Sequence, residues 1–444
     1  MIMEEQNNKK ERRSIVVPDQ YQSIQAAVDA ALPGDRILVK NGVYKETISI
    51  TDDKSSIKII ASGKEVIMDG STLQMNSNGF TITGNVVNVK IKGFHIRNYG
   101  GNGILLVGAK SCIIKKNTIY NNTTGIFVSS PSFDNEITDN SIFNNANGIT
   151  SVNTNDNYYS YNMIYQNTGN GFILNQSNDE TIFTNVIRNN QQNGIGINGG
   201  AAHILEGNEI VNNSQNGIIL AAGLSYRIMN NKIMDNKVNG IQSNNVFAIN
   251  IENNRINDNN TGILMNSCRN SVVKNNTINH NINHGISLNN ESVSILLGNT
   301  INENGGNGIF AGTSLVQSSI YNNVIFRNSI NGIHISESVL NTIQNNDIVK
   351  NGENGILMDQ LTNLNTISWN KTLKNNRDGI QINGDNAHIL RNKSISNGKV
   401  GIRINGNNNR IIANKAFKNG KLDIMNNGIN NIYEKNKFGT SNLT

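Results

Sequence analysis

Near the C-terminal end of the sequence, three side chains suited to acid–base chemistry fall at related positions of a repeat. They are His334, Asp359 and Arg403, and Gln381 lies between the last two. A histidine or a carboxylate can take the C5 proton of a uronate sugar, while an arginine stabilises the sugar carboxylate. We therefore predict these three as catalytic residues for β-elimination or epimerisation, with Gln381 as a substrate contact. The alternative interpretation is that all four are ordinary solvated side chains.

Basic side chains are concentrated in the same region. Residues 321–444 contain 15 Lys and Arg against 8 Asp and Glu, and the whole chain has a net charge of +6. Two repeat positions carry the lysines that we predict to bind substrate, namely Lys371, Lys393 and Lys415 at one position and Lys350 and Lys374 at the other. Stacked like charges repel, and a polyanion would relieve that repulsion.

An acidic polysaccharide is therefore the expected partner of these lysines. A surface that only keeps the protein soluble is the alternative interpretation. Nucleic acid is a weaker candidate, because no aromatic stacking platform accompanies the lysines in the sequence.

The spacing of these residues follows a repeat of a glycine and an apolar residue every 22 to 24 positions. A period of this size indicates one structural unit that is stacked many times. The copies begin at Gly103, Gly125, Gly148, Gly171, Gly194, Gly217, Gly240, Gly262, Gly285, Gly308, Gly332, Gly355, Gly379 and Gly401.

A second motif, Asn-x-Ile, runs in phase with the glycines, as at Asn208 and Ile210 or Asn231 and Ile233. Apolar residues alternate over runs of three to five, which is the periodicity of strands. Stacked Ile columns would fill a narrow core, and stacked Asn columns would bond from coil to coil. These patterns predict an all-β fold, a single-stranded right-handed parallel β-helix of about 15 coils with 22–24 residues per coil.

The N-terminal stretch predicts a cap on this β-helix. We expect a disordered polar and basic segment at 1–14, a strand–helix–strand cap at 15–50, the β-helix at 51–432 and a C-terminal cap or tail at 433–444. Asp19 or Ser23 can cap the short helix, and Pro33-Gly34-Asp35 ends it. Such a helix would cover the open end of the solenoid.

Several motifs resemble pectate-lyase-like right-handed β-helix proteins. They are Ser23-Ile24-Gln25-Ala26-Ala27, Pro33-Gly34-Asp35, Gly42-x-Tyr44-x-Glu46 and Met68-Asp69-Gly70. The later coils resemble the carbohydrate-binding and sugar-hydrolysis repeat family, and are similar to the periplasmic copper-binding maturation protein of nitrous oxide reductase. The resemblance implies the fold and a role in carbohydrate recognition or processing. The fold hosts lyases, hydrolases, epimerases and tailspikes as well as non-enzymes.

The catalytic motifs of polygalacturonases and alginate epimerases do not occur in this sequence. The resemblance admits Ca²⁺ as a cofactor, but no series of coils is rich in Asp and Glu, and we predict none. His280 and His284 straddle a turn, and no Cys and His cluster has zinc-like spacing, so we predict no metal site. Copper handling would follow only from the resemblance.

No apolar segment in the sequence is long enough for a signal peptide or a membrane span. The location is therefore open, with the cytoplasm as the default and delivery on a particle or surface as the alternative. An outward apolar stripe predicts a contact surface, for instance in a homotrimer. Its members are Leu105, Phe127, Ile173, Ile219, Leu264 and Phe310.

Two functions remain open at this stage. The first is recognition or processing of an acidic polysaccharide by a lyase-like or epimerase-like surface. The second is a binding or structural role on a particle surface, without catalysis.

Overall fold

Three parallel β-sheets, here called A, B and C in the order in which the chain crosses them, build the part of the chain that the computed structural model describes, residues 13–443. The chain divides into two compact units, Met1–Gly169 and Asn170–Thr444. Each turn of the chain adds one strand to each sheet, as in a right-handed parallel β-solenoid. The predicted fold class is thus confirmed.

The first unit contains three sheets and the single α-helix of the described chain. Sheet A consists of β1 (Ser14–Val17), β2 (Arg36–Val39), β5 (Lys58–Ala61), β8 (Lys90–Lys92), β11 (Ile113–Lys115), β14 (Glu136–Thr138) and β17 (Tyr158–Ser160). Sheet B consists of β3 (Gly42–Tyr44), β6 (Val66–Asp69), β9 (His95–Arg97), β12 (Thr118–Tyr120), β15 (Ser141–Phe143) and β18 (Met163–Tyr165). Sheet C consists of β4 (Ile48–Ile50), β7 (Phe80–Thr83), β10 (Asn102–Val107), β13 (Thr124–Ser129) and β16 (Asn147–Val152).

The helix α1 (Ile24–Ala30) lies between β1 and β2 in the sequence. The Ser23 hydroxyl accepts a hydrogen bond from the Ala26 amide at 3.1 Å, and the Glu46 carboxylate accepts from the Ile24 and Gln25 amides at 2.9 and 3.0 Å. These acceptors satisfy amides that the helix itself leaves unpaired. A lid-like role of α1 over the end of the solenoid stays a prediction. Of the predicted disordered segment 1–14, residues 1–12 lie outside the described residues.

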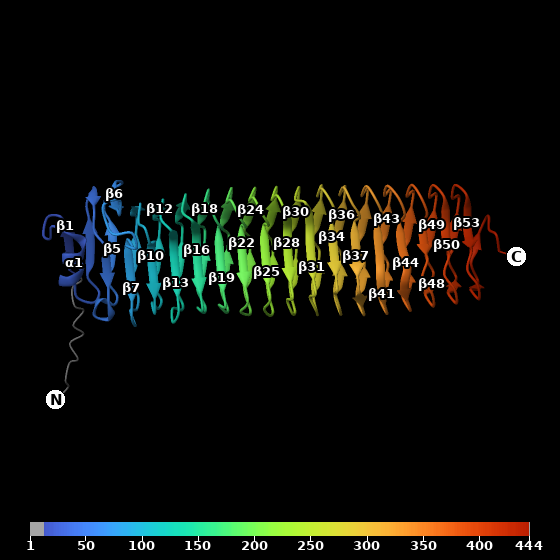
Figure 1. The fold of residues 1–444 in the computed structure, drawn as a ribbon, viewed down its shortest axis with the longest axis horizontal. Helices are drawn as coiled ribbons and strands as arrows, with labels where there is room; N and C mark the ends of the chain where they lie inside the picture. Colours follow the sequence, from blue (N-terminus) through green and yellow to red (C-terminus); the bar gives the residue numbers. More distant parts are fainter. Residues whose placement is uncertain (1–12, 444) are drawn as a thin grey trace, which may run out of the picture. The chain divides into compact units, whose positions relative to one another are not determined.

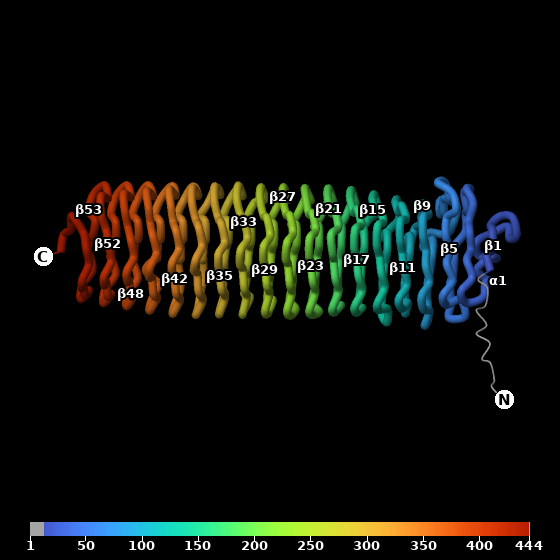
Figure 2. The backbone as a smooth tube through the Cα atoms, turned by 180° about the vertical axis from the view of Figure 1, so that it is seen from behind, coloured from blue at the N-terminus to red at the C-terminus, as the bar shows by residue number. Residues whose placement is uncertain are grey.

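The second unit repeats the same turn from β19 to β55, in sequence order (Figure 1). Its sheet A consists of β20 (Thr181–Phe183), β23 (Ile204–Glu206), β26 (Arg227–Met229), β29 (Asn250–Glu252), β32 (Val272–Lys274), β35 (Ile295–Leu297), β39 (Ser319–Tyr321), β42 (Thr342–Gln344), β45 (Thr366–Ser368), β48 (His388–Leu390), β51 (Arg410–Ile412) and β54 (Ile432–Glu434). Several of these strands are labelled in the view from behind (Figure 2).

Sheet B of this unit consists of β21 (Val186–Arg188), β24 (Glu209–Val211), β27 (Lys232–Met234), β30 (Arg255–Asn257), β33 (Thr277–Asn279), β36 (Thr300–Asn302), β40 (Val324–Phe326), β43 (Asp347–Val349), β46 (Lys371–Leu373), β49 (Lys393–Ile395), β52 (Lys415–Phe417) and β55 (Lys437–Phe438). Sheet C consists of β19 (Phe172–Asn175), β22 (Ile195–Asn198), β25 (Ile218–Ala221), β28 (Asn239–Asn244), β31 (Thr261–Asn266), β34 (Ile286–Asn289), β37 (Ile309–Thr313), β38 (Leu315–Val316), β41 (Ile333–Val339), β44 (Ile356–Asn363), β47 (Ile380–Ile382), β50 (Val400–Ile404) and β53 (Leu422–Asn426).

The two units together make about 18 turns, so the predicted count of 15 was wrong. At the two ends, the sheet C strands β4 and β53 carry Thr47 before Ile48 and Asp423 before Ile424, where the regular coils carry a glycine. The glycine motif therefore marks the regular coils and misses coils at both ends.

The core follows the predicted columns. The isoleucines of the Asn-x-Ile and Gly-Ile motifs are fully buried, for example Ile210, Ile233 and Ile241. The asparagines stack as predicted: the Asn208 side-chain amide donates to Asn231 Oδ1 at 3.0 Å, and the Asn231 amide donates to Asn254 Oδ1 at 3.0 Å. Each asparagine also donates to a backbone carbonyl, so its buried amide has no unmet hydrogen bond.

Candidate functional site

The outward column on sheet C of the second unit has the register that the sequence predicts. His334 on β41 pairs with Leu357 on β44, which pairs with Gln381 on β47, which pairs with Arg403 on β50. Three coil steps of about 4.8 Å separate His334 from Arg403, which gives about 14 Å. The structure thus places the predicted residues on one face, but not all within reach of one another.

His334 and Asp359 form a close pair. His334 Nε2 lies 2.9 Å from Asp359 Oδ2, and the two side chains are 20% and 38% exposed. The strands β41 and β44 are 7 and 8 residues long, and their pairing slips between Ile335 and Glu337. This irregularity carries the chain past the usual end of the strand, and Asp359 turns back toward the histidine of the preceding coil.

A hollow of about 440 Å³ lies beside this pair. Its lining residues are Ser336, Glu337, Asp359, Gln360, Leu361 and Asn383. The Gln381 amide donates to Asn383 Oδ1 at 3.0 Å, so Gln381 contacts the rim of the same hollow. The arrangement offers a histidine base held by a carboxylate, next to amide and hydroxyl groups that can bind sugar hydroxyls.

Arg403 does not join this pair. Its guanidinium forms an ion pair with Asp378, with Nε 2.5 Å from Oδ2 and Nη2 3.2 Å from Oδ1. Asp378 is 3% exposed and also accepts from the Val400 amide at 2.8 Å, while its own amide donates to Asn354 Oδ1. The geometry makes Arg403 the partner of a buried carboxylate, so it does not present a free guanidinium to the hollow.

The predicted lysine positions form two columns on the second unit. Lys371, Lys393 and Lys415 pair in register on sheet B, and Lys437 extends this column. Lys350, Lys374 and Lys418 lie at the left-handed residue of the turn that follows each sheet B strand. Lys371 pairs with Asp347 at 3.0 Å, whereas within residues 13–443 the other five predicted or neighbouring lysines form no ion pair: Lys350, Lys374, Lys393, Lys415 and Lys418.

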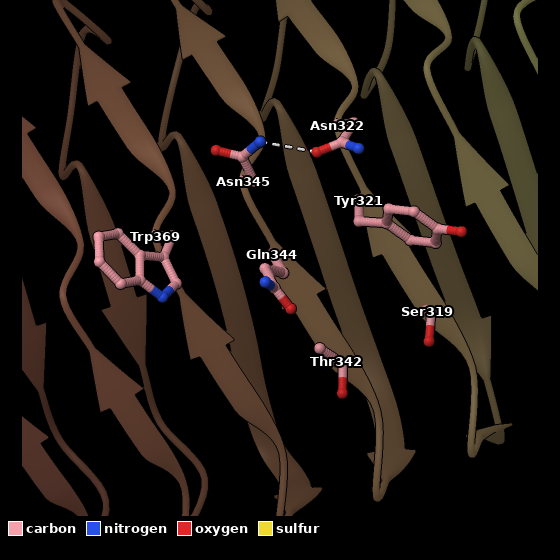
Figure 3. A pocket seen from close by; sticks show the side chains of 7 residues that line it. All are labelled: Ser319, Tyr321, Asn322, Thr342, Gln344, Asn345 and Trp369. Carbon is pink, nitrogen blue, oxygen red and sulfur yellow. Dashed lines mark hydrogen bonds between the residues drawn. The ribbon is translucent and has the colours of Figure 1, made fainter.

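An aromatic residue that the sequence interpretation missed lies next to these lysines. Trp369 is 53% exposed, and its side chain lines a hollow of about 410 Å³ together with Asp347 and Lys371. It also lines a second hollow of about 520 Å³ that includes Tyr321 and Gln344 (Figure 3). One aromatic ring therefore accompanies Lys371, and a single ring does not make the stacking platform that the sequence analysis expected to be absent. The signal was present, because Trp369 is the one tryptophan of the sequence.

The histidines do not gather into a metal site. Within residues 13–443, no group of three or more His, Cys, Asp or Glu side chains could hold a metal ion. His280 Nε2 lies 2.8 Å from Glu303, and His284 Nδ1 accepts from the Asn307 amide at 3.0 Å. The two carboxylates of the sheet C hollow, Glu337 and Asp359, provide fewer oxygens than Ca²⁺ requires. The absence of a metal cofactor stays a prediction.

The predicted apolar stripe lies on the outer face of sheet C in each unit. Leu105 pairs with Phe127 in the first unit, and Gln242 pairs with Leu264 in the second. All six stripe residues are half-buried rather than fully exposed.

No helix within residues 13–443 is long and apolar enough to cross a membrane.

Comparison with known proteins gives one extensive match and one partial match. The family described as right handed beta helix region matches residues 78–233 and 223–348. The family described as periplasmic copper-binding protein (NosD) matches residues 314–444. No protein of curated function matches the sequence.

Solved structures share the architecture at low sequence identity. The pre-mature bacteriophage phi29 gene product 12 is 9% identical, with a TM-score of 0.59, over 94% of this chain and 72% of that chain. Pectate lyase Pel9A is 17% identical, with a TM-score of 0.41, over 54% of this chain and 75% of that chain. A mutant of the periplasmic alginate epimerase AlgG is 15% identical, with a TM-score of 0.39, over 80% of this chain and 83% of that chain. The likeness to the phi29 gene product shows the fold alone, because only 9% of the residues are identical.

Proposed function

The chain belongs to the right-handed β-helix family, and we propose that the C-terminal coils of this member bind an acidic polysaccharide. The observation that carries the proposal is the pair of lysine columns, in which Lys393 and Lys415 stack directly on one another without a carboxylate partner in the described chain. Neighbouring strands lie about 4.8 Å apart. Ammonium groups at this spacing repel, and a polymer with regularly spaced carboxylates would lower that energy.

The hollows beside the columns favour a sugar polymer over a nucleic acid. Half of the residues that line the hollow containing Lys371 are asparagines, and asparagine side chains can donate to and accept from hydroxyl groups. Single-stranded nucleic acid requires several aromatic side chains on which successive bases stack. One tryptophan beside one lysine supplies a single stacking position.

Binding to a panel of polymers of matched length tests this proposal. We expect polyuronates to bind at low salt and neutral glucans to bind far more weakly to the lysine columns, because the attraction depends on charge. Single-stranded DNA is the control, because it is a polyanion that lacks the ring hydroxyl groups of a polyuronate. If the DNA binds as tightly as the polyuronates or more tightly, the partner is a nucleic acid and not a polysaccharide. If no polyuronate binds, the proposal is contradicted.

A second candidate function, lyase or epimerase activity, is favoured by the His334–Asp359 pair. If Nε2–H donates to Asp359, the lone pair on Nδ1 is left to take the C5 proton of a bound uronate. In β-elimination the C5–H electrons form the C4=C5 double bond, the C4–O4 bond breaks, and the leaving oxygen takes a proton. In epimerisation a proton returns to the opposite face of C5.

Turnover separates this candidate from binding alone. Unsaturated uronate products absorb in the ultraviolet, and exchange of the C5 proton in heavy water reports epimerisation. We expect His334→Gln to remove any such activity while it leaves folding and polymer affinity intact. A wild-type protein that binds polyuronates without either signal would identify a binding or particle-surface protein.

We also propose self-association through the half-buried apolar stripe on sheet C, in the form of a homotrimer. Light scattering of the wild-type protein gives the mass of the particle. Phe127→Glu combined with Leu264→Glu should convert a trimer to a monomer, because each change places a charge on an apolar contact. A wild-type monomer at high concentration would contradict this proposal.

A further inference from the structure

The cleft shown in Figure 3 lies on the outer face of sheet A of the second unit, at the turn that leads into sheet B. Its volume is about 520 Å³, and three successive coils supply its walls. The lining residues are Ser319, Tyr321, Asn322, Thr342, Gln344, Asn345 and Trp369. None of them carries a charge at neutral pH, in contrast to the lysine columns on sheet B.

Trp369 occupies a backbone position where the fold gives no reason for a large aromatic side chain. Its φ is 57°, in the left-handed region, and the same turn in the two preceding coils holds Asn322 and Asn345 with φ of 58° and 53°. Asparagine tolerates this conformation, whereas a bulky residue is strained there by roughly 1 kcal/mol. The indole is also half exposed, so burial does not offset the strain.

Two aromatic rings frame the cleft at a spacing set by the solenoid. Tyr321 pairs in register with Gln344, which pairs with Ser368, the residue before Trp369. Two coil steps of about 4.8 Å therefore separate the two aromatic positions by about 10 Å. The guanidinium of Arg391 lies 5.0 Å from the centre of the indole ring, and this cation–π contact helps to fix the ring's orientation.

The polar groups between the rings are free to bind a ligand. Within residues 13–443, the side chains of Ser319, Thr342 and Gln344 make no hydrogen bond to the protein. Asn345 donates to Asn322 Oδ1 at 2.7 Å, which orients both amides along the turn (Figure 3). Since these groups already face water, hydroxyl groups of a ligand can replace that water at little cost.

We propose that this cleft binds an uncharged pyranose ring of an oligosaccharide. A pyranose presents C–H groups on its face, which suit an aromatic surface, and hydroxyl groups on its rim, which suit amide and hydroxyl side chains. The seven lining side chains are uncharged and offer hydroxyl and amide groups that suit sugar hydroxyls, while the Arg391 guanidinium lies against the indole ring. The proposal does not rest on the proposed function, because the cleft and the lysine columns bind chemically different groups.

The single tryptophan gives a direct probe of this cleft. Neutral hexasaccharides of glucose, mannose and N-acetylglucosamine can be titrated into the wild-type protein while its fluorescence is excited at the indole band. We expect at least one of them to shift the emission saturably and to protect Trp369 from quenching by acrylamide. If no member of the panel changes either signal at millimolar concentration, the proposal is wrong.

Variants then locate the binding. Trp369→Asn restores the residue found in the two preceding coils, so it should fold as well as the wild type, and calorimetry should show at least a tenfold loss of affinity. Tyr321→Ala should also weaken binding, whereas Phe247→Ala, which removes a ring that is 45% exposed elsewhere on the unit, should not.

Unchanged affinity in the well-folded Trp369→Asn variant would overturn the proposal. Lys393→Glu separates the two sites, because it should leave binding of the neutral sugar unchanged. A matching loss in that variant would place the neutral ligand on the lysine columns instead, and would equally overturn the proposal. Failure of the cleft would leave polyuronate binding to the lysines untouched.

Discussion

The coils at residues 195–266 of the second unit differ from those at residues 309–404 in their sheet C strands. In the earlier coils, β22, β25, β28 and β31 have 4 to 6 residues and pair without a shift. In the later coils, β41 and β44 have 7 and 8 residues and their register slips. The interior does not change: Ile241 and Ile356 are both fully buried at the same repeat position.

The outer surfaces differ in a corresponding way. At residues 209–274, Lys232 faces Glu209 at 2.6 Å and Lys274 faces Glu252 at 3.0 Å, so each of these two lysines has a carboxylate partner. At residues 393–415, Lys393 and Lys415 follow one another in the register of sheet B, and neither has a carboxylate partner within residues 13–443. The buried core and the Asn ladder therefore stabilise the coil in both regions, while outward positions and strand ends vary.

The largest expected effect tests whether the two regions share one core. Ile233→Asp and Ile348→Asp each place a charge at a position with no exposed surface. Each should lower the free energy of unfolding by at least about 4 kcal/mol, because a buried charge without a partner is costly. Lys232→Ala is the control on a neighbouring outward position and should change it by less than about 1 kcal/mol. A parent-like melting curve for either aspartate variant would contradict the register.

The next largest expected effect is a loss of stability when Arg403, in the later coils, is replaced. Arg403→Ala leaves the buried Asp378 carboxylate without its partner, and we expect a loss of about 3 kcal/mol in the free energy of unfolding. Arg410→Ala removes an exposed arginine and serves as the control, measured in the same denaturant titration. Loss of any catalytic activity in Arg403→Ala is informative only if this stability change is measured beside it. An unchanged unfolding midpoint would show that the ion pair between Arg403 and Asp378 does not stabilise the fold.

A pH-dependent effect is expected at the boundary between the two regions. Burial raises the pKa of Glu291 to about 7, and its carboxylate accepts from the Cys268 amide at 2.8 Å. Since the folded state binds the proton more tightly than the unfolded chain, the free energy of unfolding should fall as the pH rises from about 4.5 to 7, by about 3 kcal/mol. Glu291→Gln should flatten this slope, as followed by thermal unfolding at several pH values. An identical slope in the variant would assign the pH dependence to other groups.

The repeat made most of the fold predictable, because each coil places Gly, Asn and Ile at positions that the core restricts. Gly217 shows the restriction: a Cβ there would lie 2.6 Å from Ile233 and 2.7 Å from a backbone oxygen. The terminal sheet C strands β4 and β53 have no glycine at the motif position, so the number of coils predicted from the motif was too low. Their strands are held by pairing with the regular coils, which a motif search does not detect.

The candidate site was only partly predictable, because the core does not restrict the outward positions. Register alone brought Lys393 over Lys415, and the repeat spacing was sufficient to predict it. The pair of His334 with Asp359 depends on a slipped register, and the partner of Arg403 is Asp378, which replaces the ladder asparagine before Gly379. Trp369 lies outside the core columns, so no periodicity marks it. Outward side chains are not constrained by packing, and their partners require coordinates.

The most direct test of the central claim is the salt dependence of polyuronate affinity for the wild-type protein and for Lys393→Glu with Lys415→Glu. A control with Lys116→Glu and Lys237→Glu makes the same change in net charge at two exposed lysines outside the columns. We predict that the column variant binds at least tenfold more weakly at low salt and that its affinity falls less steeply as salt rises, because exposed charges are screened beyond about 10 Å at 0.1 M. The control should bind like the wild type. Equal affinities for all three proteins, or an affinity that salt does not change, would contradict the account.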